Sequence, residues 1–453
     1  MAAKSIAVLG GGLAGLSAAE ALVRGGHTVT LFEASDTLGG FIRTEETGGW
    51  LIESGPNSFQ EATDSLRQTI ARLGLAPERL EASPAARHRF VVRRGRLVPL
   101  PLSPPAFLTS PLFSPGTKAK VLLEFFRRPA ARLQDISVAA FVRDHFGQEI
   151  LDYAVQPFVS GIYAGDPEAL SVEQAFPTLA ALEKKHGSLL RAQLALKRPR
   201  ANEPRALPAV ISFKSGLAAL VAAYVARLPA GSIRRHSRVT GLRREGNWRV
   251  SVVGADAATG ESFDAVISTL PAGALATLAI GRGEPSPLAT LGAVPHPPVA
   301  SLFLGYRREQ VAHPLNGFGV LVPSLEKRNL LGALFSSTLF AGRAPQGHVA
   351  ITALAGGALA PGLARLDQAG LLRALAPDLQ LLLGVRGEPV FIRHAAWPRS
   401  IPQYDLRHAR VLSAITAAET AHPGLFIGGM IRDGISLPAA IAAGERLAAA
   451  ASR

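Results

Sequence analysis

The feature that most constrains the fold is a glycine-rich turn near the start of the chain. Residues 5–9 are apolar and predict a strand, and Gly10, Gly12 and Gly15 follow directly with the spacing Gly-x-Gly-x-x-Gly. Glycines at this spacing allow a tight turn and let the backbone approach a pyrophosphate, whose charge is favoured by the positive end of the next helix. The turn therefore predicts a bound dinucleotide.

The residues around this turn strengthen the prediction. A helix is expected from Leu13 to Arg24, and a second strand over residues 28–32 ends immediately before Glu33. An acidic side chain at this place can accept hydrogen bonds from ribose hydroxyls, and it disfavours the 2′-phosphate of NADP. A glycine turn that binds nothing and an NAD site are the alternatives, and the complete pattern makes both weaker than FAD.

A second glycine pair follows the acidic residue. Gly39 and Gly40 precede Arg43, and in this order they resemble FAD-binding proteins of the amine-oxidase type, in which a glycine turn and an arginine lie along the dinucleotide. The chain has no cysteine, which excludes a flavin linked through a cysteinyl sulfur, as well as disulfides and iron–sulfur clusters. We therefore expect one non-covalently bound FAD per chain.

Composition and charge limit which partners and locations are expected for the protein. Of 453 residues, 48% are hydrophobic and 18% are charged, and no apolar run reaches the ~18 residues that cross a bilayer. The net charge of +14 favours an anionic membrane surface or an anionic substrate. The basic residues are dispersed without a nucleic-acid motif, so we expect no nucleic-acid partner. The 11 histidines lack metal-binding spacing, so we expect no metal.

Strand patterns recur in the middle and at the end of the chain. Residues 233–239, 248–253 and 264–269 are typical of strands, and residues 424–429 form a last strand and turn before a helix from about 438 to 451. These patterns predict an α/β fold with a discontinuous Rossmann-like FAD-binding domain of the amine-oxidase-like type. Its three pieces are residues 1–85, 206–280 and 410–453.

Two other units are expected between these pieces. Short β-like runs predict an α+β substrate-binding domain made of residues 86–97 and 281–409, and helical patterns predict a helical insertion over residues 98–205. Apolar residues beside basic ones in the insertion predict a face that contacts the membrane, with ordinary core helices as the open alternative. The expected location is the cytoplasm, peripheral on the inner face of the cell membrane.

The most specific segment is residues 157–167, Pro-Phe-Val-Ser-Gly-Ile-Tyr-Ala-Gly-Asp-Pro. Here the chain closely resembles the oxygen-dependent, FAD-containing protoporphyrinogen oxidases. The resemblance continues in order along the chain, through residues 55–59, 182–188, 335–345 and 397–404. Two departures, Arg407 in place of a usual glycine and Met430 in place of a usual asparagine, leave the flavin contacts there open.

The resemblance implies oxidation of protoporphyrinogen IX to protoporphyrin IX in haem biosynthesis, with dioxygen as acceptor and hydrogen peroxide as product. The flavin carries this chemistry, so no catalytic side chain is expected. Coproporphyrinogen III is the alternative substrate; a flavin amine oxidase, a desaturase and a flavin-binding scaffold without turnover are weaker alternatives. A homodimer is kept as an expectation for the assembly.

The resemblance also implies a set of site residues. For the substrate, Arg89 would bind a propionate, Phe340 and Leu321 would flank the ring, and Gly161 and Gly165 would lie near the flavin; an exposed arginine and ordinary core packing are the open alternatives. The residues expected to contact FAD are Gly10, Gly12, Leu13, Ala14, Gly15, Glu33, Ala34, Gly39, Gly40, Arg43, Gly55, Pro56, Asn57, Ser58, Val239, Trp397, Gly429, Ile435, Ser436 and Leu437.

Overall fold

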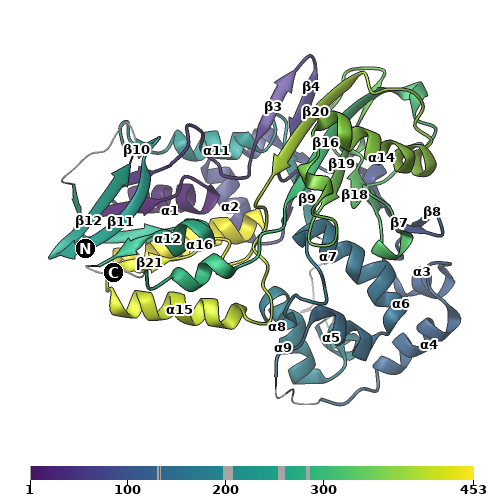
Figure 1. The fold of residues 1–453 in the computed structure, drawn as a ribbon, viewed down its shortest axis with the longest axis horizontal. Helices are drawn as coiled ribbons and strands as arrows, with labels where there is room; N and C mark the ends of the chain where they lie inside the picture. Colours follow the sequence, from purple (N-terminus) through teal and green to yellow (C-terminus); the bar gives the residue numbers. More distant parts are fainter. Residues whose placement is uncertain (1, 130–131, 133, 197–207, 254–260, 282–285) are drawn as a thin grey trace.

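A five-stranded parallel sheet brings together strands from the start, the middle and the end of the chain (Figure 1). The computed structural model describes residues 2–129, 132, 134–196, 208–253, 261–281 and 286–453. The strand order in this sheet is β10 (Ile233–Arg234), β2 (Thr28–Phe32), β1 (Ser5–Leu9), β14 (Ala265–Ser268) and β21 (Leu425–Ile427). Parallel strands covered on both faces are the architecture on which dinucleotides bind at the carboxyl ends.

Both faces of this sheet are buried. Ile6 and Val8 of β1 point to one face and join a core with helices α1 (Leu13–Arg24), α2 (Asp64–Arg72), α11 (Ala218–Val225) and α16 (Leu437–Ser452). Ala7 and Leu9 point to the other face and join a core with Trp248. That second core lies under a four-stranded sheet and two helices: β13 (Ser262–Phe263), β12 (Asn247–Val253), β11 (Arg238–Glu245), β15 (Ala279–Ile280), α12 (Ala272–Thr277) and α15 (His408–Ala421).

The strand expected over residues 233–239 is wrong as one element. β10 ends at Arg234 and β11 begins at Arg238, because His236 between them adopts a φ of +53°, a left-handed conformation that interrupts a strand. The two halves therefore belong to different sheets.

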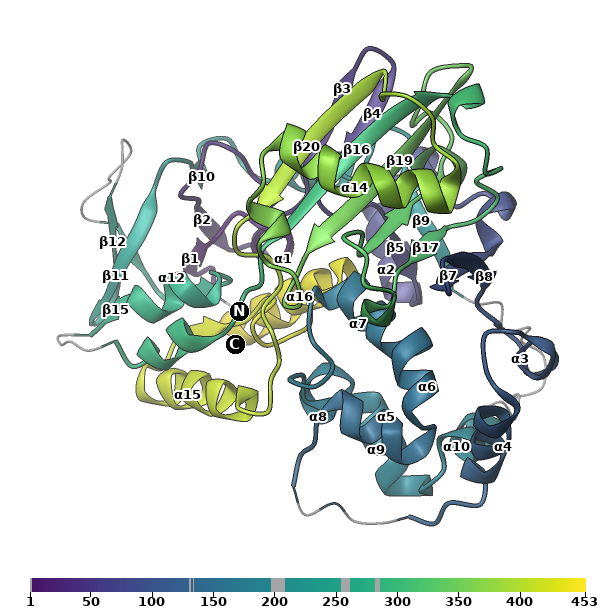
Figure 2. The same cartoon turned by 45° about the vertical axis from the view of Figure 1, so that its right-hand side comes forward.

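A seven-stranded sheet forms the second layer (Figure 2). Its only parallel pair among the described strands is β17 with β7, and helix α14 (Gln368–Leu383) covers one of its faces. The strand order is β20 (Phe391–Trp397), β16 (Val299–Arg307), β19 (His348–Gly356), β18 (Gly332–Leu334), β17 (Gly319–Leu321), β7 (Arg89–Arg93) and β8 (Arg96–Pro99).

The helical segment lies below this sheet in Figure 1. Its core includes Phe141, Tyr163 and Tyr404, and a π-helical turn over residues 151–155 joins α6 to α7. Its helices are α3 (Pro104–Thr109), α4 (Pro115–Glu124), α5 (Val138–His145), α6 (Gln148–Ile150), α7 (Gln156–Tyr163), α8 (Val172–Ala175), α9 (Pro177–His186) and α10 (Leu189–Leu196). Among the described residues, no helix is long and apolar enough to cross a membrane.

Smaller elements join the layers. The hairpin of β3 (Thr44–Thr47) and β4 (Trp50–Glu53) belongs in sequence to the expected FAD-binding piece, but Trp50 stacks on Phe391 of the seven-stranded sheet with ring centroids 5.3 Å apart. A three-stranded sheet contains β5 (Phe59–Glu61), β9 (Ala209–Phe213) and β6 (Arg79–Glu81), and α13 (Ser336–Leu339) lies beside β19. Short 3₁₀ turns cover residues 76–78, 84–87, 289–293, 308–310, 324–326 and 363–365. The residue boundaries of the three expected domains stay a prediction.

Candidate cofactor and substrate site

The glycine turn leaves free space where a pyrophosphate is expected. Gly10 has a φ of +101°, and its amide donates to the Phe32 carbonyl oxygen at 2.8 Å. A Cβ built on Gly12 would meet no atom within 4 Å. Leu13 and Ala14 begin α1 and are buried, and Gly15 packs against the Gly10 carbonyl. Backbone atoms therefore fill the space beside Gly15, whereas the space beside Gly12 is free for a ligand.

Glu33 is fixed beside the turn. Its Oε2 accepts a hydrogen bond from the Gly11 amide at 2.8 Å, and its Oε1 accepts two from Ser35, from the amide and from the hydroxyl, each at 2.8 Å. The Glu33 carbonyl accepts from the Ser237 amide at 2.8 Å, which brings Ala34 and the region of Val239 to the same edge. A carboxylate held this rigidly suits a ribose diol.

The second glycine pair, Gly39 and Gly40, packs against the first glycine turn. The Gly39 amide donates to the Gly11 carbonyl at 2.8 Å, and Gly12 and Gly39 form an isolated parallel bridge. Gly39 and Gly40 both have positive φ, at +98° and +62°. Arg43 turns back on this loop and donates to the Leu38 and Ile42 carbonyls at 3.1 and 2.9 Å, so here it stabilises the loop beside Gly12.

The C-terminal turn lies at the carboxyl ends of β14 and β21. A Cβ on Gly429 would lie 3.6 Å from the carbonyl oxygen of Thr269, the residue that also contacts Gly10. Ser436 caps α16 by accepting a hydrogen bond from the Ala439 amide at 3.2 Å, which starts the helix at Leu437. Ile435 packs instead against the core of the helical segment. The N-termini of α1 and α16 therefore open toward the same edge of the sheet.

Trp397 connects the two layers. Its Nε1 donates to the Ser54 carbonyl at 2.9 Å, and its ring lies 5.1 Å from the Phe41 ring. A Cβ on Gly55 would fall 1.9 Å from the Phe41 carbonyl oxygen, so the turn requires glycine there. Asn57 folds back on Gly55 with a hydrogen bond of 3.1 Å. Pro56 and Ser58 are half-buried in the same segment, and their cofactor contacts stay a prediction.

The expected substrate residues share one face of the seven-stranded sheet. In the register, Arg89 pairs with Gly319, which also pairs with Leu334, and Val91 pairs with Leu321. Since side chains alternate along a strand, these residues point away from the face that α14 covers. Leu321, Leu334 and Leu354 of this face are half-buried. The face is therefore largely apolar and partly uncovered.

Helix α7 approaches this face. The Cδ2 atom of Leu321 lies 2.9 Å from the position that a Cβ on Gly161 would take, so the glycine permits a close contact. Gly165 is different, because a Cβ there would lie 2.3 Å from Oε1 of Gln403, whose amide nitrogen donates to the Tyr163 carbonyl at 2.8 Å. The structure brings Leu321 and Gly161 together and packs Gly165 against Gln403.

Arg89 lies on this face without a carboxylate partner among the described residues, as does the exposed Arg96 on the edge strand β8. Arg93 pairs with Glu149 at 2.7 Å, and Arg393 pairs with Glu45. The guanidinium of Arg89 lies over the Phe318 ring at 5.2 Å from its centroid. Phe318 packs on the small core that contains Phe340, which is only 2% exposed. Arg89 is thus a free cation at the edge of an apolar surface.

Several residues at the site have no strong local sequence signal. Thr269 fills the space between Gly10 and Gly429, Ser35 and Gly11 hold Glu33, and Tyr404 donates its hydroxyl hydrogen to the Met430 carbonyl. Thr269 ends an expected strand, and the Tyr404 segment was part of the resemblance. Ser35 and Gly11 hold Glu33 through hydrogen bonds that form only in the folded chain.

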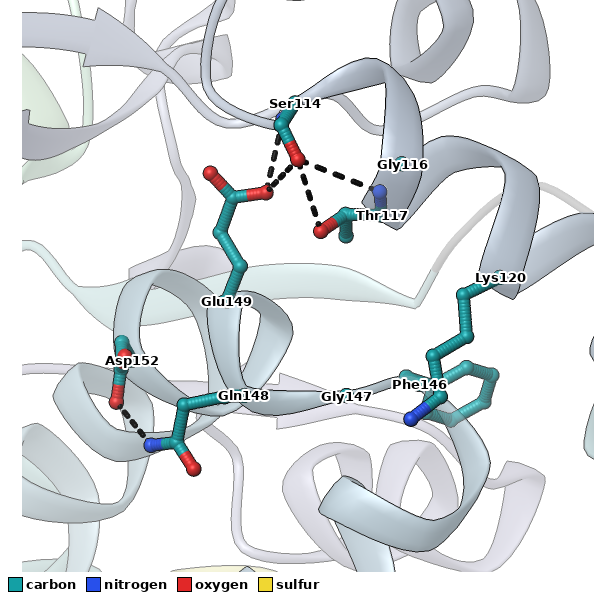
Figure 3. A pocket seen from close by; sticks show the side chains of 9 residues that line it. All are labelled: Ser114, Gly116, Thr117, Lys120, Phe146, Gly147, Gln148, Glu149 and Asp152. Atoms are coloured by element: carbon teal, nitrogen blue, oxygen red, sulfur yellow. Dashed lines mark hydrogen bonds between the residues drawn. The ribbon is translucent and has the colours of Figure 1, made fainter.

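A separate hollow of about 440 Å³ lies in the helical segment, away from the expected site residues (Figure 3). The Glu149 carboxylate in it accepts from the Ser114 amide and hydroxyl, both at 2.8 Å. Burial alone would raise the pKa of Glu149, but hydrogen bonds from Thr117, Ser114 and Arg93 outweigh it and lower the pKa to about 2. The hollow is lined by Ser114, Gly116, Thr117, Lys120, Phe146, Gly147, Gln148, Glu149 and Asp152.

A glycine turn at the carboxyl edge of a parallel sheet, with an acidic residue beside it and an apolar sheet face opposite, defines a dinucleotide-dependent oxidoreductase. Residues 13–452 match the family model of the flavin containing amine oxidoreductases, and the chain belongs to this family. It therefore has a flavin cofactor.

Named relatives extend over nearly the whole chain. Protoporphyrinogen oxidase 2, chloroplastic/mitochondrial, from Arabidopsis thaliana is 34% identical, over 98% of this chain and 93% of its own length. Coproporphyrinogen III oxidase from Bacillus subtilis is 27% identical, over 98% and 96%. Among solved structures, cyclohexylamine oxidase from Brevibacterium oxydans superimposes with a TM-score of 0.70 at 16% identity, over 100% of this chain and 99% of its own, which shows a shared fold.

Proposed function

We propose that the chain is an FAD-dependent oxidase that converts protoporphyrinogen IX to protoporphyrin IX, with dioxygen as the acceptor. The observation that carries the proposal is the placement of Arg89, a guanidinium without a carboxylate partner among the described residues, at the edge of a half-buried apolar sheet face. An apolar tetrapyrrole macrocycle with propionates on one side matches such a surface. Full-length similarity to protoporphyrinogen oxidases supports the same substrate class.

FAD is the flavin that these residues fit. The open space at Gly12 suits a pyrophosphate, Glu33 suits the ribose, and the N-terminus of α1 favours the negative charge. The chain has no second Gly-x-Gly-x-x-Gly after a strand, which argues against a separate nicotinamide site. Electrons from the reduced cofactor would then pass to a diffusing acceptor, for which we propose dioxygen, giving hydrogen peroxide three times per porphyrin.

The flavin, when bound, supplies the acceptor for hydrogen removed from saturated carbon and nitrogen. The chain's own residues bind and orient. Arg89 would pair with a propionate through its planar fork, while Leu321 and the neighbouring leucines would exclude water from the macrocycle. Gly161 lets α7 lie close to this surface, as its 2.9 Å approach to Leu321 indicates. No side chain is needed as a catalytic acid or base.

Coproporphyrinogen III is the second candidate, because relatives with that name align over nearly the full chain. It carries four propionates rather than two. On this sheet face Arg93, Arg393 and Arg307 pair with carboxylates. Arg89 and the exposed Arg96 at the far edge have no carboxylate partner among the described residues, and of these two Arg89 lies beside Phe318. A single unpaired arginine next to the leucines of the face favours the substrate with fewer carboxylates.

Adding porphyrinogen to the flavin-loaded protein without oxygen tests the proposal. Loss of the oxidised flavin absorbance, and its return when air is admitted, is the expected result. A flavin that stays oxidised with both porphyrinogens would contradict turnover and indicate a binding protein.

We also propose that the protein lies peripherally on an anionic membrane, on the cytoplasmic side. Helix α4 has an unusual distribution of side chains: Glu124 is buried, whereas Leu122, Leu123 and Phe126, just beyond the helix end, are 56%, 67% and 73% exposed. Arg128 lies nearby and is exposed. Exposed apolar residues beside basic ones are typical of an interfacial helix.

A further inference from the structure

A buried guanidinium lies between the cofactor loops and the substrate side. Arg343 follows α13 and is 2% exposed. It donates to the Ser212 hydroxyl and the Phe213 carbonyl at 3.0 Å, and to the Lys214 carbonyl at 3.2 Å. These acceptors are neutral, and no carboxylate oxygen of the described residues forms an ion pair with Arg343. A buried charge without a direct counter-ion is unfavourable unless hydrogen bonds hold it.

The same guanidinium fixes an aromatic ring. Its Cζ atom lies over the Phe340 ring at 5.5 Å from the centroid. Phe340 belongs to the small core on which Phe318 and Leu334 pack, and Arg89 lies over Phe318. A cation–π contact is stronger when both groups are desolvated, as they are here. Arg343 therefore determines where the Phe340 ring sits relative to the apolar face.

The same backbone segment, residues 212–217, also holds a buried acidic group, Glu53. It is 3% exposed, and its carboxylate accepts from the Leu217 amide at 2.7 Å and the Thr44 hydroxyl at 2.8 Å. A Cβ on Gly216 would lie 2.8 Å from Glu53 Oε1, so the loop is closely packed there. Burial raises the pKa of Glu53 to about 7, although both hydrogen bonds and the Arg343 charge lower it.

Glu53 lies between loops that are expected to hold the cofactor. Thr44 follows Arg43 directly, and Glu53 precedes Gly55 by two residues. Leu217 precedes α11, whose Val221 lies 2.8 Å from a Cβ built on Gly39. Two segments expected along the flavin, around Arg43 and Gly55, thus meet the loop before α11 at one carboxyl group.

We propose that Arg343 is a positioning residue that fixes the buried Phe340 ring behind the substrate slot. Through the backbone of residues 212–217, which accepts from Arg343 and donates to Glu53, it also links that slot to the loops that hold the flavin. The inference rests on the proposed function, because it assigns the core around Phe340, with Phe318 and Leu334 packed on it, to the wall of a porphyrin site. Arg343 itself touches neither the substrate nor the reacting atoms.

Binding of the product protoporphyrin to the FAD-loaded protein, followed by quenching of porphyrin fluorescence, gives the test. Arg343→Met and Phe340→Leu are each expected to weaken binding roughly tenfold to thirtyfold, from the size of one desolvated cation–π contact, and FAD content should be retained. The double variant should bind no more weakly than either single one, because both changes remove the same contact. Additive losses would overturn the proposal.

Two further variants keep the test decisive. Arg343→Lys keeps the charge but not the planar fork, so it should lose affinity with a folded, flavin-bound protein even if Arg343→Met is unstable. Arg308→Met removes an arginine that also donates to a backbone carbonyl, of His313 at 2.6 Å, and should leave porphyrin binding unchanged. Wild-type protein that binds no porphyrin would refute the proposed function, whereas normal binding by Arg343→Lys would refute only the role of Arg343.

Discussion

Gly15 lies so close to Gly10 that a Cβ built on it would fall 1.9 Å from the Gly10 carbonyl oxygen. Backbone fills that space, so Gly15→Ala must displace the turn or the start of α1. We expect a loss of about 3 kcal/mol or more of unfolding free energy in the cofactor-free protein, the upper range for overpacking, measured by urea denaturation. A stability within error of wild type would contradict the close packing.

Gly12→Ala is the matched control at the same turn. Gly12 has a φ of −70°, which alanine adopts readily, and its Cβ would meet no atom. Stability without cofactor should stay within about 0.5 kcal/mol of wild type. The methyl group would occupy the pyrophosphate space, so FAD affinity should fall roughly tenfold or more, the equivalent of one charge-assisted hydrogen bond. Flavin titration of the apoprotein measures this.

Arg89→Ala tests the propionate site. Removal of a guanidinium that pairs with a carboxylate costs about 1.5–3 kcal/mol, so the KM for porphyrinogen should rise about tenfold to a hundredfold, with a smaller change in kcat. Arg393→Ala removes the arginine that already pairs with Glu45 and should change KM little. Equal KM values for wild type and Arg89→Ala in a fluorescence assay would remove Arg89 from the site.

Glu53 predicts a pH-dependent stability. Its folded-state pKa of about 7 exceeds the ordinary 4.5, so its protonated form is favoured by folding. That stabilisation is fully present below about pH 4.5 and is lost as the pH rises through 7. Glu53→Gln cannot ionise, so wild type should lose about 3 kcal/mol relative to it over this range. Parallel urea midpoints from pH 5 to 8 would contradict the assignment.

Arg343→Met extends the same measurement. The Arg343 charge lowers the pKa of Glu53. Removal of this charge should therefore shift to higher pH the range over which Glu53 ionises and the protein loses stability. Thr44 and the amide of Leu217, which also face the carboxyl group, carry no charge and stay in place.

Leu122→Ser with Leu123→Ser tests membrane contact. Both side chains are more than half exposed, so their loss should not destabilise the fold. Binding to vesicles that contain anionic lipid should weaken by at least roughly tenfold, since each leucine contributes about 1.5–3 kcal/mol when buried. Flotation of both proteins at low salt measures this, with Leu381→Ser, a leucine on α14 that is 51% exposed, as the control. Wild type that fails to float would contradict a peripheral location.

The sequence predicts those parts of the fold whose signals are local. Helix α1 spans Leu13–Arg24 as expected, because glycine turns bound it on both sides. Helix α5 spans Val138–His145, within the helical insertion expected over residues 98–205, where Ser137 caps an amphipathic run by accepting from the Ala140 amide. The hairpin of β7 and β8 turns at residues 94 and 95, where both have positive φ.

The remainder depends on contacts between distant segments. Trp50 draws the β3–β4 hairpin onto the seven-stranded sheet because its ring stacks on Phe391, and no local pattern records that partner. Glu53 and Arg343 lie far apart in the sequence and interact only after three loops have converged. The family resemblance named Arg89 and Leu321, but the strand register places them on one sheet face.

The central claim is tested most directly by supplying the purified flavin-loaded protein with protoporphyrinogen IX and with coproporphyrinogen III in air, and by following porphyrin fluorescence. We predict rapid formation of protoporphyrin IX, with a kcat/KM above that for coproporphyrinogen III. Rates for both substrates no higher than spontaneous oxidation would contradict the account.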